Sequence, residues 1–133
     1  MSRLPPVSAH VLVIEDDPDI RRDMVAPLEA ETPWLKVSSA GDGMEALEIL
    51  DEGPEPCLVL LDLMMPVMNG LEFLDAARER GLGSKLRVVL VSGYGQLASR
   101  VKDPDVAGML SKPFRAEELL DLVHRHCADG ARS

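Results

Sequence analysis

The chain has 133 residues, which is enough to bury one sizeable core and too few for two ordinary domains. Hydrophobic residues make up 46% and charged residues 28% of the sequence, a balance that indicates a globular fold and excludes a disordered chain. The formal net charge of −9 disfavours direct binding to nucleic acid or to a membrane, and no apolar run approaches the roughly twenty residues that a membrane span needs.

The start of the chain and its two cysteines bear on its location. Residues 1–7 have neither the basic region nor the apolar stretch of a signal peptide, so we expect a cytoplasmic protein. Cys57 and Cys127 are not spaced as metal ligands or as a C-x-x-C motif. Because structural disulfides are rare in the cytoplasm, we expect both to be small core-facing residues that are not bonded to each other.

The first predicted strand, residues 10–14, is a β-branched apolar run that ends abruptly in acids and a proline. Asp17 can cap the following helix, and Pro18 suits its first turn, where no amide donor is needed. Pro27 predicts a kink or an early end of this helix. Its apolar face is formed by residues at helical spacing, namely Ile20, Met24 and Leu28.

The alternation of strand and helix continues to the end of the chain. Further strands are predicted at residues 35–39, 57–61, 86–91 and 106–110. The helices between and after them have apolar faces at Met44, Leu47 and Leu50, at Leu71, Leu74 and Ala77, at Leu97 and Val101, and at Leu119, Val123 and Cys127. Five strands alternating with five helices predict one parallel sheet with helices on both faces. We expect one domain at residues 10–127, a flexible N-terminus at 1–9 and a C-terminal tail at 128–133.

Polar residues stand where the predicted strands end. Glu15 and Asp16 end the first strand, Asp62 the third and Ser92 the fourth, and Lys112 follows the fifth. The strands of a parallel sheet all point the same way, so these residues should meet at one edge. Three carboxylates in one crevice repel each other, and oxygen ligands without His or Cys favour a hard ion such as Mg²⁺. The alternatives are a simple acidic helix start and a solvated surface lysine.

Four motifs at these strand ends carry a family resemblance. They are VLVIEDD at 11–17, LDLMMPVMNG at 61–70, VSG at 91–93 and KPF at 112–114. Together, in this order, the chain from His10 to Cys127 resembles the receiver domains of bacterial two-component response regulators. The resemblance implies a flavodoxin-like fold, with a five-stranded parallel sheet in the order 2-1-3-4-5.

The resemblance also implies a Mg²⁺ site. Asp16, Asp62 and the backbone carbonyl of Met64 would bind the ion directly, and Glu15 would help through water. Asp62 would be the nucleophile that takes a phosphoryl group from a phosphohistidine.

Other residues would assist this transfer. Lys112 would pair with the carboxylate before the reaction and with the phosphoryl group after it. The Ser92 hydroxyl and the Gly93 amide would donate to phosphoryl oxygens, which agrees with the electrostatic character of phosphoryl transfer. The Lys112–Pro113 peptide should be cis. Switching should involve Ser92 and Met109, where many receivers have an aromatic residue. Met109 could not act as an aromatic toggle, although it could repack.

The implied function is a phosphoacceptor switch, not an enzyme acting on other substrates, because it catalyses only its own phosphorylation and dephosphorylation. Its partners would be a histidine kinase or phosphotransfer protein and a downstream protein, without nucleic acid or membrane. One alternative is a haloacid-dehalogenase-like phosphohydrolase, although Met64 stands where that family needs a second aspartate. Another is a receiver-shaped interaction module that does not use phosphate.

Overall fold

The computed structural model describes residues 9–82, 86–93 and 105–132. In chain order the elements are β1 (Ala9–Ile14), α1 (Pro18–Glu31), β2 (Leu35–Ala40), α2 (Gly43–Glu52), β3 (Leu58–Asp62), α3 (Gly70–Glu79), β4 (Val88–Ser92), β5 (Val106–Ser111) and α5 (Ala116–Arg132). The helix predicted around Leu97 and Val101 lies outside the described residues. No helix in the described ranges has the length and apolarity that a membrane span requires.

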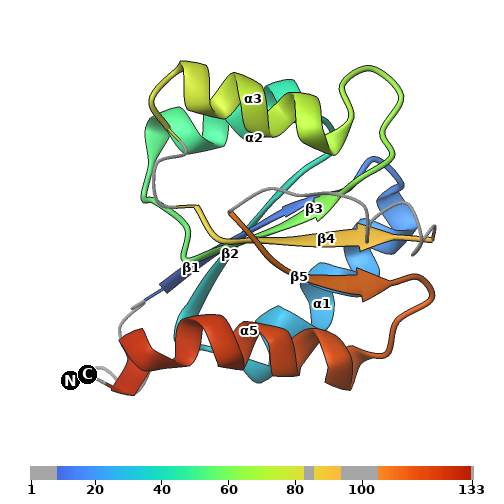
Figure 1. Ribbon diagram of the computed structural model, residues 1–133. Coiled ribbons are helices and arrows are strands. Elements are labelled where there is room, and N and C mark those ends of the chain that lie inside the picture. The colour runs from blue at the N-terminus through green and yellow to red at the C-terminus, as the bar shows by residue number, and fades with distance from the viewer. Residues whose placement is uncertain (1–8, 83–85, 94–104, 133) are drawn as a thin grey trace.

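The five strands form one sheet in the order β2-β1-β3-β4-β5, and every pairing is parallel. Helices α2 and α3 cover one face of the sheet, and α1 and α5 cover the other (Figure 1). The expected fold class and strand order are therefore confirmed. A parallel sheet covered on both faces explains why β3 and β4 are buried at every position.

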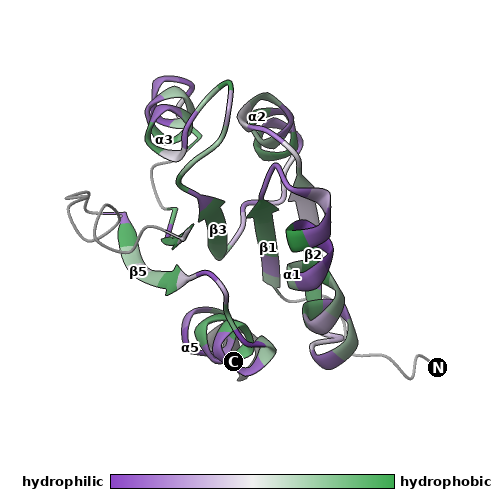
Figure 2. Cartoon of the chain, turned by 90° about the vertical axis from the view of Figure 1, so that its right-hand side faces the viewer, coloured by the Kyte–Doolittle hydropathy of each residue, from purple (hydrophilic) through white to green (hydrophobic). Residues whose placement is uncertain are grey.

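The two faces of the sheet form two hydrophobic cores, because successive side chains of a strand point to opposite faces. In β1, Leu12 and Ile14 face the core beneath α2 and α3, whereas Val11 and Val13 face the core beneath α1 and α5. Figure 2 shows the hydrophobic strands β1 and β3 at the centre of the molecule and, around them, helices that contain both hydrophilic and hydrophobic residues.

Helix α1 starts as its sequence predicts. The Asp17 side chain accepts hydrogen bonds from the amides of Asp19 and Ile20, at 2.8 and 3.3 Å, and Pro18 is the first helical residue. The helix continues past Pro27 to Glu31, so the early end considered for Pro27 does not occur. The buried faces of Met24 and Leu28 hold the last turns against the sheet.

Two predicted core positions are wrong. Met44 and Leu71 each stand in the first turn of a helix, and their side chains are 51% and 38% exposed. Their places in the core are taken by Ala46 and Phe73, which are fully buried. A face chosen from apolar spacing alone does not fix the rotation of the first turn, and here Met68 covers the start of α2 instead: its sulfur lies 2.5 Å from where a side chain on Gly43 would begin.

The expectation of two unbonded cysteines is wrong. A disulfide joins Cys57, just before β3, to Cys127 in α5, with a Cα–Cα distance of 5.9 Å. Both residues do belong to the core beneath α1 and α5, as expected. Their meeting follows from the packing of α5 across the start of β3, which a separation of 70 residues conceals in the sequence.

Regular structure also extends beyond the expected domain limits. Strand β1 begins at Ala9, which pairs with Leu35, and α5 continues through the expected tail to Arg132. The Lys112–Pro113 peptide is cis, as predicted, and so is Gly53–Pro54.

Candidate functional site

A cavity of about 460 Å³ opens at the carboxyl edge of the sheet. The strand order brings the ends of β1 and β3 side by side, with β4 next to β3 and β5 beyond β4. The cavity is lined by residues from the ends of these strands and the start of α1, namely Glu15, Asp16, Asp17, Ile20, Asp62, Met64, Gly93 and Lys112. Six of the predicted site residues therefore line one cavity, whereas Ser92 and Met109 are not part of its lining.

Three carboxylates lie together in this cavity. One oxygen from each of Glu15, Asp16 and Asp62 falls within 4.8 Å of the others. Glu15 and Asp62 are almost wholly buried, at 1% and 3% exposure, although both are charged residues. An acidic helix start without further function would leave such side chains in water, so burial and convergence exclude that alternative for Glu15.

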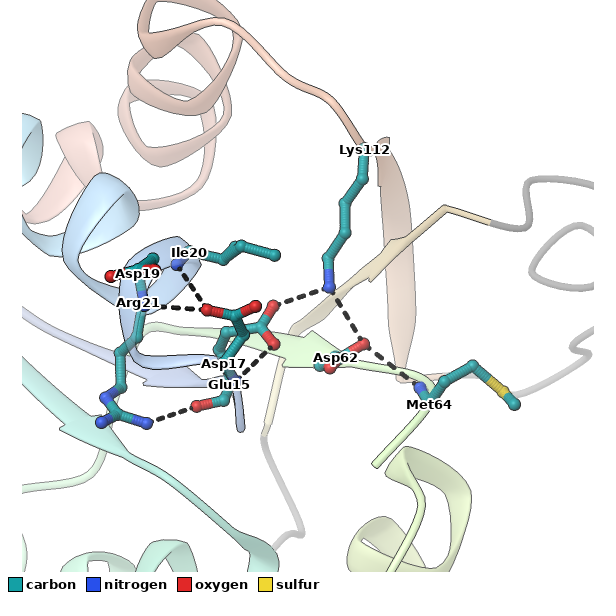
Figure 3. Close-up of polar contacts among 8 residues, drawn as sticks. All are labelled: Glu15, Asp17, Asp19, Ile20, Arg21, Asp62, Met64 and Lys112. Carbon is teal, nitrogen blue, oxygen red and sulfur yellow. Dashed lines mark hydrogen bonds and ion pairs between the residues drawn. The ribbon is translucent and has the colours of Figure 1, made fainter. Parts of the chain in front are cut away.

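Lys112 provides the positive charge next to these acids. Its Nζ lies 2.8 Å from Oε1 of Glu15 and 3.5 Å from Oδ1 of Asp62, and Figure 3 shows the side chain reaching from the end of β5 toward both. Partial burial alone would lower the pKa of Lys112, but its contacts with Glu15 and Asp62 outweigh this and raise the pKa. Lys112 is thus not a solvated surface lysine.

The electrostatics of the cavity act most strongly on Asp62. Burial, hydrogen bonding with Glu15 and Asp16 and the charge of Glu15 raise the pKa of Asp62 to about 7, while the charge of Lys112 opposes part of this rise. One lysine therefore does not compensate the three acids. A further cation would relieve the remaining repulsion.

Backbone contacts fix the orientation of the two buried acids. Oε2 of Glu15 accepts a hydrogen bond from the amide of Asp17 at 3.2 Å. Oδ1 of Asp62 accepts one from the amide of Met64, also at 3.2 Å. These local bonds hold each carboxylate at the end of its strand and leave other oxygen lone pairs for a ligand.

Arg21 is a contributor that the sequence reasoning missed. Its Nη1 donates a hydrogen bond of 2.7 Å from α1 to the backbone carbonyl of Glu15 (Figure 3). The same atom lies 3.0 Å from where a Cβ on Gly41 would stand, so the absence of a side chain at Gly41 lets the guanidinium pass. The sequence carries no signal for this contact, because Arg21 donates to a backbone carbonyl.

Ser92 and Gly93 stand at the end of β4 beside the cavity. Ser92 is buried and lies opposite Ser111 of β5, and its carbonyl accepts a hydrogen bond of 2.9 Å from the amide of Lys112. Gly93 lines the cavity, and a Cβ there would lie 4.0 Å from Cβ of Lys112. The structure thus brings both to the edge where their roles were predicted.

The two predicted methionine positions differ. Met64 lines the cavity and its side chain is 50% exposed. Met109 is also half-exposed, at 49%, but it lies opposite Leu90 within the β4–β5 pair and does not line the cavity. Any part it has in switching would be played on the surface of β5.

The donor set fits a hard divalent cation. All candidate ligands are oxygens, and among the described residues no other group of three acids, histidines or cysteines comes together in this way. Oε1 of Glu15 is buried and receives no geometrically favourable hydrogen bond in the described part of the chain, although Lys112 lies 2.8 Å from it. An incompletely satisfied buried carboxylate beside two others is the environment that such an ion stabilises.

Comparison with known proteins agrees with this geometry. A family model, the response regulator receiver domain, matches residues 11–124. The nitrate/nitrite response regulator protein NarL of Escherichia coli is 34% identical over 120 residues, which cover 90% of this chain and 55% of that protein. The transcriptional regulatory protein PdtaR of Mycobacterium tuberculosis is 34% identical over 119 residues, covering 88% and 56%. The chain spans about half the length of these curated relatives.

A solved structure supports the same assignment. The response regulator protein TrrA from Thermotoga maritima, crystallised in complex with Mg(2+)-BeF, superposes with a TM-score of 0.74 at 27% identity. The match covers 88% of this chain and 97% of that one. The parallel order β2-β1-β3-β4-β5, the acidic cavity at its carboxyl edge and the family match over most of the chain lead to one conclusion: this chain belongs to the family of response regulator receiver domains.

Proposed function

We propose that this chain is a phosphoacceptor switch in which Asp62 takes a phosphoryl group from a phosphohistidine donor. The observation that carries the proposal is the burial of Asp62 beside Glu15 and Lys112 in a cavity at the sheet edge. In the transfer, an oxygen of Asp62 forms the new bond to phosphorus as the bond from phosphorus to the histidine nitrogen breaks. The receiver unit proposed for this reaction is residues 10–127.

Mg²⁺ is the proposed cofactor. Asp16, Asp62 and the carbonyl of Met64 would hold it, with Glu15 acting through water. When bound, it would neutralise negative charge on the phosphoryl oxygens. The complex of TrrA with Mg(2+)-BeF supports this choice.

The remaining residues of the cavity have proposed roles in positioning and charge compensation. Lys112 would move from its shared contact with Glu15 and Asp62 to the phosphoryl group. The hydroxyl of Ser92 and the amide of Gly93 would bind phosphoryl oxygens. Preorganised donors of this kind contribute because they do not need to reorganise when charge develops.

The phosphodonor would be a histidine kinase or a histidine phosphotransfer protein. A second cavity, of about 620 Å³, shares Ile20 and Lys112 with the acidic one and continues along α1 to Pro113 and Phe114. A protein donor must bring its phosphohistidine to Asp62, and this largely apolar groove leads there. We therefore propose the groove as part of the donor's contact surface.

The output would pass through contacts with a downstream protein in the cytoplasm. With a formal net charge of −9, the chain itself is a poor ligand for DNA, RNA or an anionic membrane. The relative PdtaR is named a transcriptional regulatory protein and is longer than this chain, so any contact with DNA in that protein can reside in its additional length.

Intact-mass analysis tests the assignment of Asp62. Incubation with Mg²⁺ and acetyl phosphate should add one phosphoryl group to the wild type and none to Asp62→Asn. Asp121→Asn, which changes an exposed acid of α5, is the matched control and should be labelled as the wild type is. Full labelling of Asp62→Asn would refute the assignment.

The same preparation separates the two alternative functions. Steady release of phosphate from an external phosphoester would favour a phosphohydrolase, but Met64 occupies the position of the second acid which that chemistry requires. Unchanged affinity for the downstream partner after phosphorylation would favour an interaction module that does not use phosphate.

A further inference from the structure

The disulfide between Cys57 and Cys127 lies at the opposite end of β3 from Asp62. It fastens the last part of α5 to the start of that strand. The closed loop contains Asp62, Ser92 and Lys112, and therefore most of the proposed phosphoryl site. The bond is thus a covalent link between β3 and α5, which otherwise meet through apolar side chains of one core.

The two cysteine residues differ in exposure. Cys127 is 2% exposed, whereas Cys57 is only partly buried, so a reagent in solution meets Cys57 first. The sulfur of Cys57 lies 3.2 Å from the backbone carbonyl of His10. In the disulfide this is a contact without a hydrogen, but in the reduced protein the thiol could donate to that oxygen. The surroundings therefore accommodate both redox states.

Among the described residues, two further contacts to other parts of the chain are seen at residues 124–126 of α5. His124 meets the ring of Trp34 edge-on at 6.0 Å, and the carbonyl of His126 accepts a long hydrogen bond of 3.4 Å from Arg87. Val123 is the last buried residue before Cys127. Without the disulfide, residues 124–126 would keep only this ring contact and this long hydrogen bond among their described polar and aromatic contacts to other parts of the chain, while Leu119 and Val123 keep the first half of the helix on the sheet.

We propose that Cys57 and Cys127 form a reversible dithiol–disulfide site that reacts with small thiols and disulfides of the glutathione class, and that its redox state sets how firmly the end of α5 is held. This proposal does not depend on phosphorylation of Asp62. It goes beyond the phosphoacceptor function by adding a second chemical input at the other end of the sheet.

The exchange proceeds in two balanced steps. A small thiolate attacks the accessible sulfur of Cys57, forming a mixed disulfide, and the thiolate of Cys127 leaves and takes up a proton. A second small thiolate attacks the small-molecule sulfur of that mixed disulfide and releases Cys57, which is protonated in turn. Two small thiols are oxidised to one disulfide as the protein disulfide is reduced to two thiols.

Redox titration of the folded chain tests the chemistry. The protein is equilibrated in buffers with different ratios of glutathione to glutathione disulfide. An alkylating agent then blocks the free thiols, and intact-mass spectrometry counts them. We expect conversion from zero to two alkylated thiols across this series, and a glutathione adduct at Cys57 in Cys127→Ser. Two free thiols in every buffer, or a bond that survives in every buffer, would each overturn the proposal.

Hydrogen exchange tests the consequence for α5. Amides of residues 124–132 should exchange at least about tenfold faster in the reduced protein, while those of β1 stay unchanged. The double variant Cys57→Ser/Cys127→Ser should match the reduced wild type and ignore the buffer. Because the reduced wild type needs no mutation, equal exchange in its two redox states would refute the proposal even if the variants fail to fold.

Discussion

Lys112 lies closer to Glu15 than to Asp62: its Nζ is 2.8 Å from Oε1 of Glu15 and 3.5 Å from Oδ1 of Asp62. The lysine was expected to pair with Asp62 before the reaction, but it divides its charge between two acids and makes its shorter contact with the one that is not the proposed nucleophile. Its movement toward a phosphoryl group on Asp62 would therefore also release Glu15.

Replacing Glu15 by Gln should lower the pKa of Asp62. Burial contributes most to the raised value, and Glu15 adds to it by both hydrogen bonding and charge. Removing that charge while keeping the shape should bring the pKa down from about 7 by roughly one unit. A ¹³C carboxyl titration by NMR measures the change. Glu45→Gln, in the first turn of α2, is a control that should leave the titration of Asp62 unaltered.

The stability of the metal-free protein should depend on pH through Asp62. Its pKa rises from 3.8 to about 7 on folding, so between these values the folded state holds a proton that the unfolded state has lost. This contribution is fully present below about pH 4 and is lost as the pH rises through 7. Asp62→Asn removes it. The wild type therefore loses this contribution as the pH rises, whereas the variant does not. From pH 5 to pH 8 the difference in unfolding free energy should change by about 2 kcal/mol in favour of Asp62→Asn.

Urea denaturation of both proteins in the presence of a chelator measures this difference. A gap between wild type and Asp62→Asn that is the same at pH 5 and pH 8 would contradict the raised pKa. Adding Mg²⁺ at pH 8 should raise the denaturation midpoint of the wild type and leave that of Asp62→Asn nearly unchanged, because binding to the folded state alone stabilises it.

Arg21→Met should weaken Mg²⁺ binding without unfolding the chain. The guanidinium donates to the carbonyl of Glu15, and without that bond the end of β1, which carries the acid pair, is less firmly placed. We expect an affinity loss of about three- to tenfold by calorimetry, since a charged hydrogen bond contributes roughly 1 kcal/mol or more. Arg22→Met is the matched control. Arg22 makes an exposed ion pair with Asp19, so its replacement should leave the affinity unchanged.

A negative charge introduced into the groove along α1 should slow phosphoryl transfer from protein donors but not from small-molecule donors. Ala26→Asp places a carboxylate in the proposed contact surface without touching the acidic cavity. Transfer from a phosphorylated histidine kinase should slow by roughly tenfold or more, whereas labelling by acetyl phosphate should not change. Ala30→Asp, one turn further along and outside the groove lining, serves as the control. Equal slowing with both donors would place the defect in the acidic cavity and not in docking.

Much of the molecule could be predicted because each local signal agreed with the global fold. Buried runs such as residues 58–62 and the cap at Asp17 each specify one element on their own. The acidic cavity followed from these elements, since parallel strands bring their ends to one edge whatever their order. The proximity of Glu15, Asp62 and Lys112 could thus be predicted from the order of the elements alone.

The features that escaped prediction depend on contacts between distant parts of the chain. Arg21 was overlooked because its partner is a backbone carbonyl, which has no signature in the sequence. The rotation of α2 that exposes Met44 depends on Met68, which covers the start of that helix. The bond between Cys57 and Cys127 depends on how α5 crosses the sheet, and the assumption of a reducing compartment pointed the other way.

The hydrogen bond from the amide of Lys112 to the carbonyl of Ser92 joins the ends of β4 and β5 through the backbone. A movement of the backbone at either residue is therefore transmitted to the other without a contact between side chains. A backbone movement at Ser92 would therefore also move β5, on which Met109 is half-exposed. Because this chain has no aromatic residue at position 109, the backbone is the most direct connection from the proposed phosphoryl site to the surface of β5.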